Sequence, residues 1–167
     1  MPTTINALTY NMSFATQISK ALASEADFVE ACQKKYKRGG FQCIENAVKN
    51  IGKLPKLDLV GIQELNSDVD KSIMKVQENL DKFERGKTGI ATVSILWNSD
   101  IFGKVKYKKV FNLFDGDSRP CLILIMEHNF ILVNMHFPWS IRKHIALKNL
   151  KNGINKDKHL RKAFYDN

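Results

Sequence analysis

The sequence lacks an apolar run long enough to span a membrane as a helix, and its first residues lack the basic-then-apolar layout of a signal peptide. Cysteine is scarce as well: Cys32, Cys43 and Cys121 are widely spaced, and no two of them form a Cys-x-x-Cys pair. An odd number of scattered cysteines favours free thiols over a disulfide framework. We therefore expect an intracellular protein, cytoplasmic or nuclear, with reduced cysteines.

Acidic residues are few relative to basic ones, 17 against 26, which gives the chain a net charge of +9. Residues 142–167 contain eight Lys or Arg and two Asp, so this segment carries +6 of that charge. A basic surface favours a polyanion, such as nucleic acid or an anionic membrane, because binding releases counterions. A lysine-rich helix exposed to solvent would explain the same composition without a partner.

No internal repeat, low-complexity segment or linker interrupts the 167 residues, and 44% of them are hydrophobic. This composition suffices for one domain over residues 1–167. The spacing of apolar residues predicts helices near residues 24–32, 44–51, 69–83 and 140–150. Residues 34–41, with two adjacent glycines and four basic residues, indicate an exposed loop.

Apolar runs bounded by charged or turn residues predict strands at residues 5–10, 57–63, 91–97, 105–111, 121–126 and 130–133, the last two as a hairpin. Three of these strands end in polar side chains: Asn11, then Glu64, then Asn134 with His136. A carboxamide, a carboxylate and an imidazole are costly to bury without partners. We expect them to meet at one rim of a sheet, where they can bind a metal ion and a phosphate.

The same strand ends resemble motifs of the endonuclease/exonuclease/phosphatase superfamily. The matching segments, in the order of the family, are Thr9-Tyr10-Asn11-Met12, Ile62-Gln63-Glu64-Leu65 and Val133-Asn134-Met135-His136. Two further segments are similar to links between these motifs, Ile95-Leu96-Trp97-Asn98 and Ser118-Arg119-Pro120. The resemblance implies a DNase I-like fold, which is an α+β sandwich of four layers. It also implies a hydrolase that cleaves phosphoric esters with Mg²⁺ or Mn²⁺.

The resemblance further implies roles for the polar side chains. Glu64 would be the metal ligand, Asn11 would bind the metal shell or a phosphate oxygen, and His136 would contact the scissile phosphate. Asn134 would brace the imidazole or bind phosphate. The guanidinium of Arg119 can clamp a phosphate, but it can equally pair with the acidic residues just before it. The ordinary alternatives are a surface carboxylate, a turn asparagine and a hydrogen-bonded core histidine.

Two motifs of the family are missing after His136: a Gly-Asp-Phe-Asn-like segment and a terminal Asp-His pair. Asp157 and His159 lie in a lysine-rich stretch with no strand before it, so we expect a solvated helix or loop there. The chain thus resembles the N-terminal portion of the family domain, with an incomplete second sheet. Open sheet edges would then need a homo-oligomer or a complementing chain to cover them.

Three functions follow from these features. The first is a divalent-metal-dependent phosphodiesterase that acts on nucleic acid, a nuclease in the broad sense. The second is a catalytically impaired or inactive relative that binds nucleic acid or a protein partner through the retained cleft. The third is a phosphoesterase acting on a phospholipid or an inositol phosphate. Trp97 and Trp139 could stack on a base, but buried packing is the more frequent fate of tryptophan.

Overall fold

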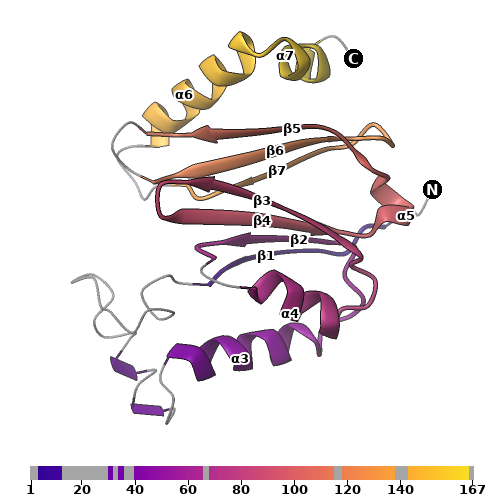
Figure 1. The fold of residues 1–167 in the computed structure, drawn as a ribbon, viewed down its shortest axis with the longest axis vertical. Coiled ribbons are helices and arrows are strands. Elements are labelled where there is room, and N and C mark those ends of the chain that lie inside the picture. The colour runs from indigo at the N-terminus through magenta and orange to yellow at the C-terminus, as the bar shows by residue number, and fades with distance from the viewer. Residues whose placement is uncertain are drawn as a thin grey trace.

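The computed structural model describes residues 4–12, 30–31, 34–35, 40–65, 68–114, 118–137 and 143–165. Within them two sheets are stacked between two layers of helices (Figure 1). The first sheet, sheet A, has four strands in the order β1 (Ala7–Asn11), β2 (Leu59–Gln63), β4 (Ala91–Trp97), β3 (Lys82–Thr88). The second, sheet B, has three strands in the order β5 (Val105–Asn112), β6 (Pro120–Met126), β7 (Ile131–Met135).

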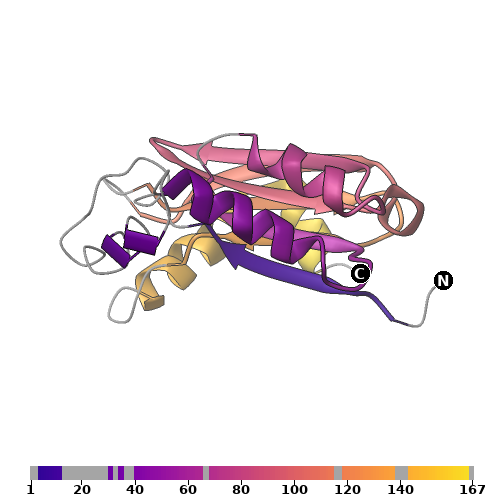
Figure 2. The same cartoon turned by 90° about the horizontal axis from the view of Figure 1, so that it is seen from below.

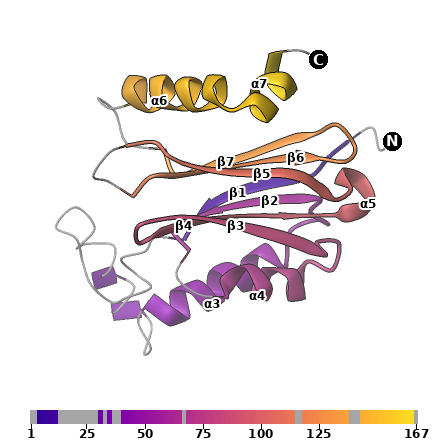
Figure 3. The same cartoon turned by 45° about the horizontal axis from the view of Figure 1, so that its top comes forward.

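The strands β1 and β2 are parallel, and all the other neighbours are antiparallel. The outer face of sheet A is covered by α3 (Gly40–Ile51) and α4 (Val69–Val76), and that of sheet B by α6 (Lys143–Lys156) and α7 (Lys158–Tyr165) (Figures 1 and 3). A short helix, α5 (Ser99–Phe102), leads from β4 towards β5. The expected layered sandwich of helices and mixed sheets is therefore confirmed.

Three apolar clusters hold the four layers together. One lies between α3, α4 and sheet A, a second between the two sheets, and a third between sheet B and the C-terminal helices. In the third, Gly153 of α6 lies against the ring of Phe111 on β5, and a Cβ atom at this glycine would stand 2.7 Å from the ring. The absence of a side chain at Gly153 lets the helix approach the sheet.

The helix expected over residues 69–83 ends early, and this prediction was wrong beyond Val76. Residues 82–88 form β3 instead, because this segment pairs with β4 along its whole length. The chain turns at Gln77, a residue 4% exposed, whose side chain accepts from Leu57 N and donates to Ile51 O at the end of α3. Tertiary hydrogen bonds of this kind outweigh a helical apolar stripe.

Two smaller expectations also fail. Lys34 and Lys35 are helical, and α3 begins at Gly40, so the loop expected over residues 34–41 is not present at those positions. Cys43 is disulfide-bonded, whereas Cys121 is free and buried. The cysteines as a set therefore no longer argue for a reducing compartment. The helix start expected at residues 24–27 lies outside the described residues.

The Asp157 carboxylate is also not solvated, because its side chain is only 9% exposed. It accepts a hydrogen bond from Tyr107 Oη at 2.6 Å and pairs with Lys109 Nζ at 3.2 Å, both on β5. It also accepts from the backbone N–H groups of His159 and Leu160, so it caps the start of α7. Asp157 therefore fastens the C-terminal helices to sheet B.

The geometry around Asp157 predicts an acid-sensitive contribution to stability. Desolvation opposes ionisation, but the hydrogen bonds from Tyr107 and Leu160 and the charge of Lys109 outweigh it and lower the pKa of Asp157 from 3.8 to about 2. A carboxylate with a depressed folded-state pKa stabilises the fold above its unfolded pKa and loses that effect as the pH falls. We expect Asp157→Asn to lower the free energy of unfolding by about 1–2 kcal/mol near neutral pH.

Urea unfolding of the wild type and Asp157→Asn between pH 2 and pH 6 measures this effect. The difference in free energy of unfolding between the two proteins should narrow as the pH falls from about 4 towards 2. Asp100→Asn, at an exposed carboxylate on α5, is the matched control and should show no such gap. A difference in free energy of unfolding that stays constant over this pH range would contradict the lowered pKa of Asp157.

Candidate phosphate and metal site

The ends of β1 and β2 and the segment after β7 meet at one end of the sandwich. Glu64 directly follows β2 and has a backbone φ of 58°, a conformation that residues other than glycine rarely adopt. Its Oε1 accepts a hydrogen bond from Asn11 Nδ2 at 2.9 Å and lies 2.9 Å from Nε2 of His136. Unusual backbone conformations of this kind concentrate at functional sites.

The side chains of Glu64 and His136 are only 15% and 12% exposed. The Nη1 atom of Arg119 lies 2.6 Å from Nε2 and 3.2 Å from Nδ1 of the same imidazole. Nε2 can either donate to the carboxylate or accept from the guanidinium, depending on where the imidazole proton sits. Thus a carboxylate, an imidazole, a guanidinium and the Asn11 carboxamide crowd around one point.

Asn134 is placed differently from what the sequence suggested for it. It is 6% exposed, and its Nδ2 donates to two backbone carbonyls of sheet A, Ile62 O at 2.9 Å and Ser94 O at 2.7 Å. Its Oδ1 accepts from Gln63 Nε2 at 2.5 Å. The carboxamide therefore spans the gap between the two sheets beneath the site, where a positioning role fits better than contact with a substrate.

Gly61 makes room for this cross-sheet contact. A Cβ atom at this position would lie 3.2 Å from Cγ of Asn134, tighter than most real contacts. Gln63 completes the arrangement, because its amide also donates to Oγ1 of Thr9 on β1 at 3.0 Å. Gln63 and Thr9 thus join the end of sheet A to Asn134 on sheet B.

Sequence reasoning did not assign roles to Gln63 or Thr9. Their position in the sequence could have pointed to the site, because each lies two or fewer residues from a predicted site residue at a strand end. A polar side chain that close to the rim needs a hydrogen-bond partner. The partner of Gln63 is 71 residues away on β7, so only the tertiary structure could identify it.

Other candidate residues fall elsewhere. Trp97 is 3% exposed and donates to Gly103 O, so it packs in the core and does not face a base. Trp139 and the acidic residues 115 and 117 lie outside the described residues. Asp157 contacts β5 on the outer face of sheet B, away from the cluster around Glu64.

The donor set fits a magnesium ion that keeps most of its water. Among the described residues, no group of three or more His, Cys, Asp and Glu side chains could enclose a metal. Mg²⁺ is usually held by only one or two carboxylates together with water and substrate phosphate. Glu64 with the neighbouring Asn11 carboxamide matches that pattern, and a closed zinc-type site is not formed by the described residues.

Comparisons with known proteins give the fold. No protein-family model matches the sequence, and no curated protein matches it. Among solved structures, a mannosyl-6-phosphatase from Bacteroides thetaiotaomicron is 16% identical with a TM-score of 0.60, over 97% of this chain and 62% of that one. An endonuclease/exonuclease/phosphatase family protein from the same organism is 14% identical with a TM-score of 0.59, over 99% and 69%.

A third structure is D. rerio TDP2 in complex with a single-strand DNA product, 15% identical with a TM-score of 0.51, over 91% of this chain and 54% of that one. The chain spans about half the length of the TDP2 chains from D. rerio that it matches. These likenesses show that the chain has the endonuclease/exonuclease/phosphatase fold. None of the helices among the described residues is long and apolar enough to cross a bilayer.

Proposed function

We propose that this chain is a divalent-metal-dependent phosphoester hydrolase whose substrate is nucleic acid. The observation that supports it most is the meeting of Asn11, Glu64, His136 and Arg119 at one point, although they come from four separate parts of the sequence. A salt bridge that only stabilised the fold would not need a carboxylate, an imidazole, a guanidinium and a carboxamide in contact at one end of the sandwich. Clusters of this composition are typical of phosphate chemistry.

Each side chain has a task that its chemistry allows. A bound Mg²⁺ would neutralise phosphate oxygens and polarise the P–O bonds. Glu64 would hold that ion, and Asn11, hydrogen-bonded to the same carboxylate oxygen, would keep it oriented. Arg119 can donate to two phosphate oxygens at once. His136, beside the guanidinium, would donate a hydrogen bond to a phosphate or leaving-group oxygen.

The basic C-terminal helices support nucleic acid as the polyanion. All seven Lys and Arg side chains of α6 and α7 are exposed, and the one acidic side chain there, Asp157, is occupied by Tyr107 and Lys109. A field of unpaired positive charge attracts a phosphate backbone through counterion release. The likeness to a TDP2 structure that holds single-strand DNA points to the same class of substrate.

A second candidate is a sugar-phosphate monoester, favoured by the likeness to a mannosyl-6-phosphatase. Hydrolysis assays distinguish the nucleic-acid candidate from the sugar-phosphate candidate. The substrates are end-labelled single-stranded DNA, duplex DNA, RNA and mannose 6-phosphate, each tested with Mg²⁺, Mn²⁺ or EDTA. We expect metal-dependent cleavage of a nucleic acid and a cleavage rate that falls steeply with salt concentration. Release of phosphate from mannose 6-phosphate alone would identify the second candidate.

Tight, salt-sensitive binding of nucleic acid without turnover in either metal would contradict the catalytic proposal. That outcome would indicate a binding protein that has kept the cleft. Asn134→Ala is not a suitable inactive control, because it would remove the two hydrogen bonds that Asn134 donates to the Ile62 and Ser94 carbonyls of the opposite sheet. Arg119→Met is better, since it removes the phosphate clamp and should weaken substrate binding more than it changes the fold.

A further inference from the structure

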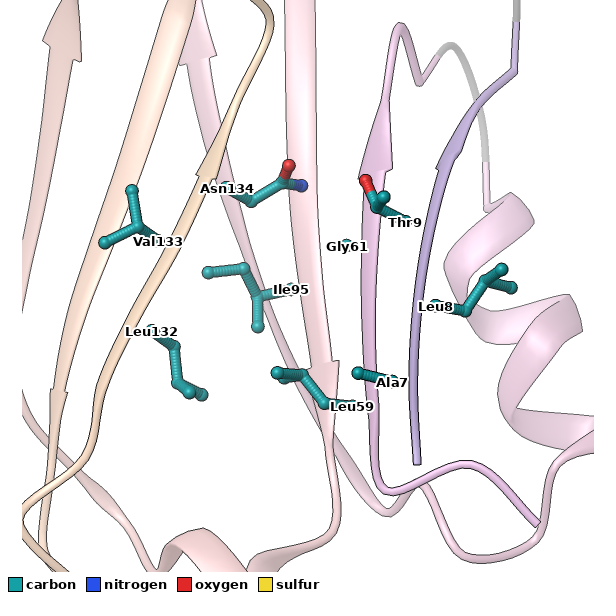
Figure 4. Close-up of a pocket in the computed structure, with 9 residues that line it drawn as sticks. All are labelled: Ala7, Leu8, Thr9, Leu59, Gly61, Ile95, Leu132, Val133 and Asn134. Atoms are coloured by element: carbon teal, nitrogen blue, oxygen red, sulfur yellow. The ribbon is translucent and has the colours of Figure 1, made fainter. Parts of the chain in front are cut away.

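The groove beside the phosphate site offers a nucleic acid little to bind. β7 lies over β4 and β2, and β1 projects beyond it as the outermost strand of sheet A (Figure 2). An apolar groove of about 240 Å³ lies beside this overhang, with Asn134 and Thr9 at one end (Figure 4). None of the nine residues drawn in Figure 4 is charged or aromatic. Further contacts with a phosphate backbone or with bases are therefore to be sought on another surface.

Helix α7 presents cations and aromatic rings to solvent together. Three of the residues of Lys158–Tyr165 are basic, and all three are exposed: Lys158, Arg161 and Lys162. Three others carry rings. His159 is exposed, Phe164 is 38% exposed and Tyr165 is 57% exposed. Aromatic side chains that gather on a surface are typical of a binding site.

Helical spacing places each of these rings beside a cation. Residues three or four positions apart are neighbours on the surface of a helix. Lys162 is one turn from His159 and from Tyr165. Arg161 is one turn from Phe164 and from Tyr165. Proteins that bind single-stranded nucleic acid combine these two groups, because cations follow the phosphates and bases stack on the rings.

One ring stack is already formed on this surface. The imidazole of His159 lies over the ring of Tyr107 on β5, with ring centroids 4.6 Å apart and an angle of 26° between the planes. Tyr107 is held by its hydrogen bond to Asp157, the residue that caps α7. His159 is exposed, so a nucleobase can extend the stack on the outer face of the imidazole.

The apolar faces of α6 and α7 are not available to a lipid bilayer. Ala146, Ile154 and Leu160 are buried in the cluster between these helices and sheet B. A helix that lies in a membrane interface needs its apolar face free to enter the lipid. Ile145 and Leu147, the exposed apolar residues of α6, are two positions apart and so lie on different sides of the helix. The exposed surface therefore fits a nucleic acid better than a membrane.

Helix α6 leads from the phosphate site to this surface. It begins at the end of the sandwich where β2 and β7 finish, and α7 follows at its other end (Figures 1 and 3). Its 14 residues span about 21 Å, and Lys148 and Lys151 are exposed along it. A stacked strand advances about 3.4 Å per nucleotide, so roughly six nucleotides would reach from the site to α7.

We propose that α7, together with Tyr107 of β5, is an accessory surface that binds single-stranded nucleic acid away from the phosphate site. His159 and Tyr165 stack on bases, and Arg161 and Lys162 bind the neighbouring phosphates. The bases must be unpaired, because those inside a duplex are already stacked on both faces. The inference rests on the proposed function for its choice of polyanion, but this binding needs no metal.

The test is a titration by fluorescence anisotropy in EDTA, where metal-dependent cleavage is excluded. The probe is a fluorescein-labelled single-stranded DNA of about 24 nucleotides, longer than the site size of a typical single-strand-binding module. The matched ligand is an abasic strand of the same length, which keeps every phosphate and lacks the bases. We expect the abasic strand to bind about tenfold more weakly, because it cannot stack on the rings. A duplex with the same number of nucleotides should also bind more weakly than the single strand.

Two variants separate the rings from the charges. Tyr165→Ala should weaken binding of the base-containing strand about tenfold and leave binding of the abasic strand nearly unchanged. Lys162→Gln should weaken both strands alike and lower the slope of log affinity against log salt by about 0.7. Lys75→Gln on α4 and Leu54→Ala are matched controls, because both side chains are exposed and lie at the helices on the other face of the molecule. Both controls should bind like the wild type.

The outcomes distinguish this surface from the catalytic proposal. Base-dependent binding in EDTA without cleavage in any metal would support the accessory surface and contradict the hydrolase. Cleavage of DNA with binding that Tyr165→Ala does not change would contradict the accessory surface alone. Equal affinity for the abasic and the base-containing strand would show that charge alone binds, and would overturn the proposal. Binding to phosphatidylserine vesicles that Tyr165→Ala abolishes, without base-dependent binding of DNA, would overturn it in favour of a membrane.

Discussion

Glu64→Gln is expected to lower the rate of metal-dependent phosphoester hydrolysis by about a thousandfold, since a bound metal contributes several kcal/mol of transition-state stabilisation. Glu64 lies at the centre of the cluster, within 2.9 Å of both Asn11 and His136. The amide oxygen of Gln can still accept from Asn11, but it lacks the charge that attracts Mg²⁺. The loss should therefore appear in metal binding as well as in turnover.

The independent measurement is the rise of the melting temperature on adding Mg²⁺, which we expect in the wild type and not in Glu64→Gln. Glu84→Gln is the matched control, because this glutamate is 37% exposed and pairs with Lys108 on β5. It should keep both the activity and the response to Mg²⁺. An active Glu64→Gln variant with a normal Mg²⁺ response would remove the basis of the proposed metal site.

Arg85→Met is expected to lower the free energy of unfolding by about 3–5 kcal/mol, because it leaves a buried carboxylate without its cation. Asp70 is fully buried, and both of its oxygens accept from Arg85, each at 2.5 Å. A further hydrogen bond joins Arg85 to Asp68 at 2.9 Å. The hydrogen bonds that Arg85 donates to Asp70 raise the pKa of Arg85 above its ordinary value, so the guanidinium stays charged.

Urea unfolding of a double variant separates the charge from the packing. Asp70→Leu combined with Arg85→Met removes both charges, so it should cost less than Arg85→Met alone. Lys108→Met breaks an exposed pair with Glu84 and should cost only about 0–1 kcal/mol. A loss below about 1 kcal/mol for Arg85→Met would show that water reaches Asp70 and replaces the guanidinium.

Arg85 also explains why α4 begins without a side-chain cap. Asp68 stands at the N-cap position but its side chain caps no backbone N–H of the helix, since its carboxylate pairs with Arg85 and Lys71. Nothing local in the sequence relates Asp68 to Arg85 on β3.

Strand positions were the most predictable part of this protein. Ala91–Trp97 was predicted to the residue, and the hairpin of β6 and β7 was expected from its short connection. Apolar runs bounded by turn residues determine where a buried strand can lie, irrespective of its neighbours. Residues 82–88 were not predicted as a strand, because their charged residues interrupt the apolar pattern. Only pairing with β4 makes this segment a strand.

The sequence alone therefore determined where every described strand except β3 lies, which polar residues stand at strand ends, and that the ordered motifs resemble one superfamily. These are local properties, set by side-chain pattern over a few residues. Tertiary structure decided what those polar residues touch: Glu64 with His136, Arg119 with the same imidazole, and Asn134 with the carbonyls of the opposite sheet. It also decided that β1 projects past β7, because the offset between two stacked sheets depends on their packing and leaves no mark on either strand.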